Sequence, residues 1–265
     1  MGGGNSNSYK EYLDSWLNGI YAEITFWDSF FKTKGKICNA TITRFNEATQ
    51  YEPEFRLEED IENDKTKLHF TAVDPLASVY KILKSKYAIN TKIQPETAMV
   101  ENLSSKFKEN EFDIVHMSNS LDHSFDPMLG LWQMLYVCKI DGKIILKHHQ
   151  NEAENENYQG FHQWNLANED GKFVIWRKNI KLDVAHILKD CAKVEYIRAE
   201  KENTSAGWEY NKVVIRKIKP CNLHFNENYP MLLERILEQI CALNYAMFQK
   251  NDYKVVKFLG IKILR

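Results

Sequence analysis

Glycine is the most informative shortage in this 265-residue chain, which contains only 11 glycines. None of them lies between Gly35 and Gly130. Glycine-rich loops bind phosphates and nucleotides because their backbone, free of side chains, can approach the ligand closely. The stretch 36–129 therefore contains no such loop.

Cysteine and excess charge are also lacking. The five cysteines are scattered, odd in number and without a Cys-x-x-Cys pair, which argues against a disulfide framework or a zinc ribbon. Their scarcity favours a reduced compartment, and we expect a cytoplasmic protein. Lys and Arg total 35 against 36 acidic residues, so we expect no nucleic-acid partner. No apolar run approaches the roughly 20 residues of a membrane span, so we expect no integral membrane contact.

The N-terminal region, residues 1–50, is dominated by one helical pattern. Aromatic and aliphatic residues recur every three or four positions from Tyr9 to Phe30. This spacing predicts a long amphipathic helix over residues 8–33. Such a face usually packs over a core, and it could also form a lid over a site.

Residues 112–149 predict a strand, a polar loop, a helix and a second strand. Ile114 and Val115 form the first apolar run, residues 129–136 have helical spacing, and Asp141-Gly142 is expected to end the helix. A unit of this kind implies parallel strands, whose carboxyl ends commonly carry the ligand site. The polar residues expected there, unless they are ordinary solvated loop residues, are Ser118, Asn119, Asp122, His123, His148 and His149.

The run from Phe112 to His123, followed by Asp141-Gly142 and by the polar stretch from His148 to Asn165, resembles class I S-adenosylmethionine-dependent methyltransferases. It is most similar to the type 11-like members found in bacterial capsular and other surface-polysaccharide loci. The resemblance spans about residues 60–218. It implies an α/β, Rossmann-like methyltransferase fold over residues 51–220, with a mostly parallel sheet and an antiparallel edge. An N-terminal helix and a C-terminal helical extension over 221–265 would flank it.

The resemblance implies S-adenosylmethionine as cofactor. Asp74 ends an apolar run, where a carboxylate can accept hydrogen bonds from the two ribose hydroxyls. An Asp-Pro turn that starts a helix over 76–86 explains the same residues. By position, Met99 and Val100 would flank the adenine, although the usual acid that binds the adenine amine has no counterpart there. The residues assigned to the cofactor are Asp74, Pro75, Met99, Val100, Ser118 and Asn119.

The family's first strand and its glycine loop have no counterpart upstream of Asp74. The stretch 51–67 is mostly charged and contains no apolar run that could form a central buried strand. Either the natural polypeptide carries an additional strand–loop–helix unit between Asp60 and Leu68, or the protein lacks it and binds the cofactor poorly. We favour the first explanation, because a missing central strand would leave backbone groups unpaired in the core.

The stretch after His149 is rich in amides, acids and aromatics, a combination typical of sugar recognition. A solvated acidic loop is the alternative, and a metal site is less favoured because the histidines have no helical or zinc-finger spacing. We therefore predict no metal. The residues assigned to the acceptor are Glu152, Tyr158, His162, Gln163 and Trp164.

The predicted activity is O-methylation of a sugar or sugar-linked acceptor, which would be a small molecule or a nucleotide-linked sugar. Transfer from a sulfonium needs alignment, and a hydroxyl acceptor also needs a base. His123 is the first choice, with Asp122 orienting it and His148 or His149 as second choices. A phosphate or phosphoramidate acceptor would need no base. The alternatives are a cofactor-free binding or scaffold protein and a metal-dependent hydrolase.

The remaining patterns predict strands at 173–176, 196–197 and 213–218, with a helix over 182–191. The last two strands would form the antiparallel edge of the sheet. Residues 230–249 predict another amphipathic helix, which could pack within the chain or form the seam of a homodimer.

Overall fold

The computed structural model describes residues 6–34, 71–89, 94–201, 209–221, five single positions between 234 and 245, and two short strands, 256–258 and 261–263. The question of a missing strand between Asp60 and Leu68 lies outside these residues. So does most of the helix predicted over 230–249. Among the described residues, none of the helices combines the length and the apolarity that crossing a bilayer requires.

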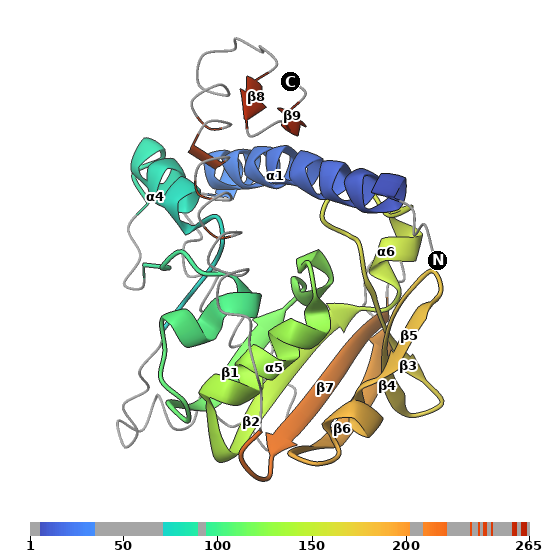
Figure 1. Ribbon diagram of the computed structural model, residues 1–265. Helices are drawn as coiled ribbons and strands as arrows, with labels where there is room; N and C mark the ends of the chain where they lie inside the picture. The colour runs from blue at the N-terminus through green and yellow to red at the C-terminus, as the bar shows by residue number, and fades with distance from the viewer. Residues whose placement is uncertain are drawn as a thin grey trace.

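The predicted N-terminal helix is confirmed as α1, Ser6–Lys34, which runs across the upper part of Figure 1, below the strands labelled β8 and β9. It buries Ile20 and Ile24 in an apolar cluster shared with α4, Ala77–Lys86. Trp27 of α1 adds an edge-to-face contact with Tyr80 of α4, at 5.5 Å between ring centroids. The aromatic stripe read from the sequence therefore packs at least partly as core.

The predicted strand–helix–strand unit is confirmed. β1, Phe112–Ser118, pairs in parallel with β2, Cys138–His149, and the chain crosses between them through α5, Pro127–Val137. Proline begins this helix, and the Asp126 side chain caps it by accepting a hydrogen bond from the Leu129 N–H at 2.9 Å. The helix ends at Val137, four residues before the turn expected to stop it, and Asp141-Gly142 lies inside β2. A Cβ at Gly142 would lie 2.8 Å from the Asp113 carbonyl oxygen, so the irregular pairing there requires glycine.

The main sheet has the order β1-β2-β7-β6, with β7 spanning Glu209–Lys217 and β6 spanning Ala192–Lys201. The predicted antiparallel edge is confirmed, because β7 runs antiparallel to both β2 and β6. The expectation of a mostly parallel sheet is wrong for the described residues. Among these four strands β1 and β2 pair in parallel, whereas β2–β7 and β7–β6 are antiparallel. Of the apolar run that ends at Asp74, the structure describes residues 71–74, and these form an isolated parallel bridge between Val73 and Glu96.

A second, antiparallel sheet follows the site region: β3, Asn165–Glu169, β4, Lys172–Arg177, and β5, Ile180–Asp183. The helix predicted over 182–191 is shorter, because β5 takes the first residues and α7 spans Val184–Leu188. Five further short elements are described: η1, Val100–Ser105; η2, Leu121–His123; α6, Glu152–Asn155; and the antiparallel pair β8, Val256–Phe258, and β9, Ile261–Ile263.

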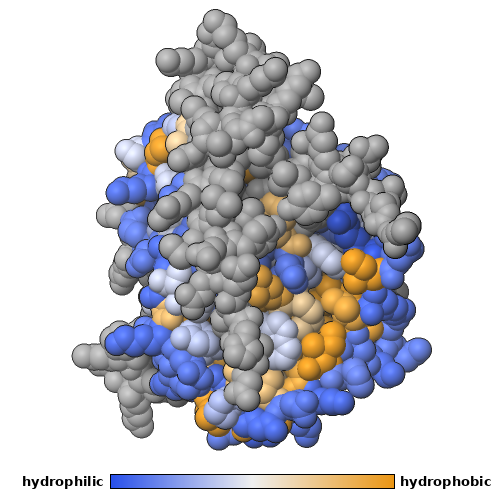
Figure 2. All heavy atoms as spheres, in the orientation of Figure 1, coloured by the Kyte–Doolittle hydropathy of each residue, from blue (hydrophilic) through white to orange (hydrophobic). Residues whose placement is uncertain are grey.

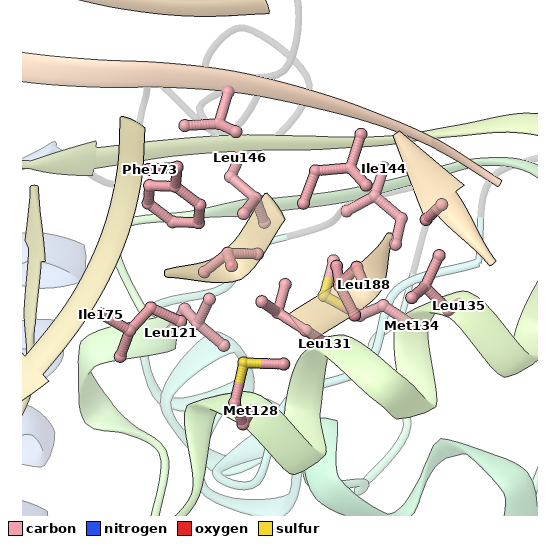
Figure 3. Packing of buried hydrophobic residues seen from close by; sticks show 14 of the residues in the cluster. Leu121, Met128, Leu131, Met134, Leu135, Ile144, Leu146, Phe173, Ile175 and Leu188 are labelled. Atoms are coloured by element: carbon pink, nitrogen blue, oxygen red, sulfur yellow. The ribbon is translucent and has the colours of Figure 1, made fainter. Parts of the chain in front are cut away.

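The main core joins α5 to both sheets. Figure 3 shows Leu131, Met134 and Leu135 of α5 facing Ile144 and Leu146 of β2, with side chains of β4 and α7 beside them. Figure 2 shows apolar residues gathered over the sheet in the lower half of one face, bordered by hydrophilic residues. This packing holds the loops at the carboxyl ends of β1 and β2 in place. The four described cysteines are free thiols, as expected.

Candidate functional site

A cluster of polar side chains lies beyond the parallel strands. β1 ends at Ser118 and β2 at His149, and the Asn119 N–H donates to the Lys147 carbonyl at 2.8 Å. The chain then makes the short helix η2, which carries Asp122. The Asp122 side chain is only 1% exposed, so a charged group lies inside the protein beside the ends of β1 and β2. Such a group needs close partners.

Three imidazoles surround the Asp122 carboxylate. His162 Nδ1 is 2.8 Å from Oδ2, a hydrogen bond across 40 positions of sequence. His123 Nε2 lies 3.4 Å from the same oxygen, and His148 Nδ1 lies 4.0 Å from Oδ1. The rings of His123 and His162 meet edge to face, with centroids 4.7 Å apart. Three of the residues assigned to catalysis, Asp122, His123 and His148, are thus brought together with His162, which was assigned to the acceptor.

Glu152 adds a second carboxyl group from α6. It is 6% exposed, and its Oε1 lies 3.8 Å from His162 Nδ1. We call Asp122, His123, His148, Glu152 and His162 together the Asp122 cluster. Its members come from three separate stretches of the chain, so only the folded sheet joins them.

The charges in the Asp122 cluster are unequal. Burial alone would raise the pKa of Asp122, but the neighbouring imidazoles of His123 and His162 outweigh it, and the pKa is lowered. Burial acts to lower the pKa of His162, but its hydrogen bond with Asp122 raises it to about 8. Burial raises the pKa of Glu152 to about 8, and repulsion by Asp122 adds to this. Burial lowers the pKa of His148 to about 3. At neutral pH the cluster therefore combines an ionised Asp122 with a neutral His148.

Several buried atoms of the cluster make no hydrogen bond. They are Asp122 Oδ1, Glu152 Oε2 and both ring nitrogens of His148. An unsatisfied buried polar atom usually costs about 1–3 kcal/mol. Unpaired polar atoms of this kind tend to mark a place where a ligand is bound.

His149 lies outside the cluster. Successive residues of a strand point to opposite faces, so His148 and His149 diverge. The His149 ring stacks on Tyr210 with centroids 3.9 Å apart, and its backbone N–H donates to Asn119 Oδ1 at 3.3 Å. Asn119 has a φ of 51°, a left-handed conformation that asparagine tolerates better than most residues. Ser118 ends β1 at this turn, where its carbonyl accepts a hydrogen bond from the Ser120 hydroxyl at 3.3 Å.

The Gln163 side chain is buried and makes hydrogen bonds within the protein through both its amide nitrogen and its amide oxygen. Its side-chain amide donates to the carbonyls of Tyr158 and Gly160 at 2.9 and 2.8 Å, and to Ser15 Oγ at 3.2 Å. Its Oε1 accepts a hydrogen bond from Arg177 at 3.1 Å. The sequence assigned Gln163 to the acceptor, but the structure gives its side chain a role in fixing the loop that carries His162.

Two other assigned acceptor residues have structural contacts. Trp164 is 9% exposed, packs in the main core and donates from Nε1 to the Phe125 carbonyl at 3.3 Å. The Tyr158 hydroxyl accepts a hydrogen bond from Asn165 Nδ2 at 3.0 Å. Of the five residues assigned to the acceptor, only Glu152 and His162 therefore lie in the Asp122 cluster.

Helix α1 packs directly on the loop of residues 158–163. A Cβ placed on Gly19 would lie 2.5 Å from the Phe161 backbone nitrogen, so only glycine allows this approach. Ser15, one turn earlier, donates to the Tyr158 carbonyl at 3.3 Å. The helix therefore covers the loop beside the Asp122 cluster as well as packing on α4.

Asp74 and Pro75, which were expected at the cofactor, come just before α4 in the chain. Asp74 is half-buried, and its Oδ1 accepts a hydrogen bond from the Leu76 N–H at 2.7 Å at the start of α4. Burial raises the pKa of Asp74 to about 7, with a smaller contribution from Glu23. The Asp-Pro turn that starts a helix is thus present, with Pro75 half-buried in it.

Met99 and Val100 are packed rather than open. Met99 is 2% exposed and belongs to the apolar cluster of α1 and α4. Val100 begins η1 and approaches α5 so closely that a Cβ on Gly130 would lie 3.0 Å from its Cγ1. The Met99 side chain is therefore not available to a cofactor, and its carbonyl accepts a hydrogen bond from the Asn102 N–H at 3.0 Å.

Sequence reasoning missed one buried acid in this region. Glu101 is 2% exposed, and its Oε1 accepts hydrogen bonds from the backbone N–H groups of Phe125 and Asp126 at 2.6 and 3.3 Å. Burial raises its pKa to about 7. Glu101 therefore ties η1 to the segment that follows Asp122 and His123. An acid three residues before a serine pair carries no sequence signal for this role.

Comparisons with known proteins give only distant structural likenesses. No protein-family model matches the chain. No curated protein matches it either. Among solved structures, a methyltransferase from Methanosarcina mazei described as S-adenosylmethionine-dependent has 14% identity and a TM-score of 0.38, over 57% of this chain and 82% of that one.

Two further structures contain S-adenosylhomocysteine. The N-methyltransferase NodS from Bradyrhizobium japonicum has 10% identity and a TM-score of 0.37, over 56% of this chain and 66% of that one. The trans-methyltransferase CalH has 12% identity and a TM-score of 0.36, over 56% of this chain and 42% of that one. The chain is thus structurally similar to methyltransferases at low identity. At this distance an activity does not transfer, and the function has to follow from the residues of this chain.

Asp74 is the described residue that fits S-adenosylmethionine best. Its half-buried carboxylate follows the parallel bridge at Val73, the position from which an acid can reach a ribose diol. Tyr80, which hydrogen-bonds the same carboxylate, would have to share it with the ribose. The remaining contacts would come from backbone at Met99 and from Ser118 and Asn119 at the end of β1.

Proposed function

We propose that this protein is an S-adenosylmethionine-dependent O-methyltransferase acting on a sugar or sugar-linked acceptor in surface-polysaccharide biosynthesis. The observation that carries the proposal is the Asp122 cluster, a buried ionised carboxylate with three imidazoles, beyond the carboxyl ends of two parallel strands. The pathway and the sugar rest on the resemblance of residues 112–165 to enzymes of polysaccharide loci. The acceptor would be a small molecule or a nucleotide-linked sugar.

The cofactor would supply an electrophilic methyl group, and the protein has to align an acceptor oxygen with it and exclude water. Asp74 would hold the ribose. We propose that Asp122 and His123 act on the acceptor. They lie beyond the ends of β1 and β2, and the imidazoles of His123 and His162 are partly exposed. His162, fixed by Asp122, would bind the acceptor as well. The packing of α1 on the loop of residues 158–163 would limit the access of water.

Cofactor binding is the first test of this function. S-adenosylhomocysteine should bind the purified full chain in a calorimetric titration, and the protein should transfer a labelled methyl group from S-adenosylmethionine to a nucleotide-sugar mixture. Absence of S-adenosylhomocysteine binding in folded protein would contradict the proposal. It would favour the second candidate, a cofactor-free binding protein, which the missing glycine loop and the occupied Asp74 carboxylate both support.

A further inference from the structure

We propose that Asp122, His123 and His162 bind a divalent transition-metal ion. One carboxylate oxygen and two imidazole nitrogens converge there, and the three donor atoms all lie within 4.8 Å of one another. This inference concerns the same site as the proposed function and rests on it only for the role of the ion in methyl transfer. The binding of the ion itself requires no cofactor.

The distances match a metal site. Ligand atoms about 2.1 Å from an ion are separated by about 3.0–3.4 Å in octahedral or tetrahedral geometry. Asp122 Oδ2 lies 2.8 Å from His162 Nδ1 and 3.4 Å from His123 Nε2. Small side-chain rotations would therefore suffice to place an ion between them, with the ion replacing the proton shared by Asp122 and His162.

A second observation points to a ligand at this place. His148 is 1% exposed, and neither of its ring nitrogens makes a hydrogen bond, although Nδ1 lies 4.0 Å from Asp122 Oδ1. Asp122 Oδ1 and Glu152 Oε2 are equally buried and make no hydrogen bond. An ion at Asp122, with a water among its ligands, would give these atoms partners. Hydrogen bonds from outer groups to metal ligands are a regular feature of metal sites.

The donor set indicates which ions fit. Two imidazoles and one carboxylate favour Zn²⁺, Fe²⁺, Mn²⁺ or Co²⁺, whereas Mg²⁺ and Ca²⁺ prefer sites made of oxygen ligands. Three protein ligands leave positions open, as in catalytic rather than structural zinc sites. An acceptor hydroxyl in an open position would become more acidic on binding the ion. His123 would then act as a ligand, not as the free base that the sequence suggested.

The test uses the full chain after dialysis against a chelator, with Zn²⁺ and Co²⁺ as probes. We expect one ion per chain by calorimetry, and a visible Co²⁺ absorption typical of nitrogen and oxygen ligands. His123→Ala and His162→Ala should each weaken Co²⁺ binding by at least about tenfold. His186→Ala is the control, because His186 is an exposed residue of α7 outside the cluster, and it should bind Co²⁺ like the wild type.

Two results would overturn the metal site: no Co²⁺ binding by the folded wild-type chain, or binding unchanged in the His123→Ala/His162→Ala double variant. Co²⁺ binding by the wild-type chain tests the metal site even if a variant does not fold. S-adenosylhomocysteine titration of the same samples separates the two proposals. Methyl transfer that survives the chelator in a protein without bound ion would contradict only the role of the ion in methyl transfer. Co²⁺ binding without S-adenosylhomocysteine binding would contradict only the proposed methyltransferase.

Discussion

The Asp122 cluster and the acids Asp74 and Glu101 differ in how their polar atoms are satisfied. The Asp122 cluster contains buried atoms of Asp122, His148 and Glu152 that make no hydrogen bond. By contrast, Asp74 and Glu101 accept hydrogen bonds from backbone N–H groups of the protein itself. Polar atoms whose hydrogen bonds are complete stabilise a fold, whereas incomplete ones indicate a ligand. The difference supports the site that we propose beside Asp122 and is consistent with a structural role for Glu101.

The largest expected effect is on turnover. Asp122→Asn keeps the shape of the side chain but removes the charge that holds the imidazoles, and we expect turnover to fall by about 10²–10⁴. Affinity for S-adenosylhomocysteine should remain nearly unchanged, since Asp74, which we propose holds the ribose, is not among the partners of Asp122. Steady-state kinetics with the labelled methyl group would check this. His186→Ala serves as the control, and near-normal turnover of Asp122→Asn would remove the cluster from the reaction.

The next effect concerns stability against pH. The pKa of Glu101 is raised by burial from 4.5 to about 7, so the neutral form favours the folded state. Its contribution is fully present below about pH 4.5 and is lost as the pH rises through about 7. Glu101→Gln, which keeps an acceptor for the Phe125 N–H, should be more stable than the wild type at pH 8 by up to about 3 kcal/mol.

Urea unfolding at pH 5 and pH 8 would measure this difference. The matched control is Glu109→Gln, at an exposed position, which should change little. A wild type that loses no stability relative to Glu101→Gln between the two pH values would show that Glu101 stays ionised in the folded protein.

Cofactor affinity gives a third effect. Asp74→Asn retains an oxygen for the Leu76 N–H but lacks the charge suited to a ribose diol, and we expect S-adenosylhomocysteine binding to weaken by about 1.5–3 kcal/mol. Because burial raises the pKa of Asp74 to about 7, wild-type affinity should also increase as the pH rises through 7. Calorimetry at several pH values, with the exposed Asp190→Asn as control, tests both statements. Equal affinities of wild type and variant would place the ribose elsewhere.

The smallest expected effect concerns the cover over the site. Gly19→Ala would place a methyl group 2.5 Å from the Phe161 backbone nitrogen, and overpacking of this kind costs about 1–3 kcal/mol. We expect a lower melting temperature, measured by circular dichroism. Ala22→Leu, at an exposed position of the same helix, should leave it nearly unchanged. If both variants melt alike, α1 does not pack tightly on this loop.

Local patterns predicted some elements well. The helix 8–33, the strand–helix–strand unit and the antiparallel edge were all recognisable, because apolar spacing directly reflects which face of an element is buried. Patterns were less reliable where two signals competed. The Asp141-Gly142 pair resembles the end of a helix, but α5 ends at Val137 and β2 begins at Cys138, so the pair lies inside the strand. Among the residues that the structure describes, the parallel pairing expected from the resemblance is limited to one strand pair and two isolated bridges.

The sequence by itself determined that a polar, histidine-rich segment follows two strands, and that Asp122 and His123 belong to it. The tertiary structure alone decided that His162, 40 residues away, hydrogen-bonds Asp122, that His148 faces this cluster, and that His149 faces Tyr210. It also decided that Gln163 and Trp164 serve the fold. The physical reason is that spacing along a chain fixes only local geometry. Which side chain completes a buried carboxylate depends on contacts between segments that meet only after the sheet has formed.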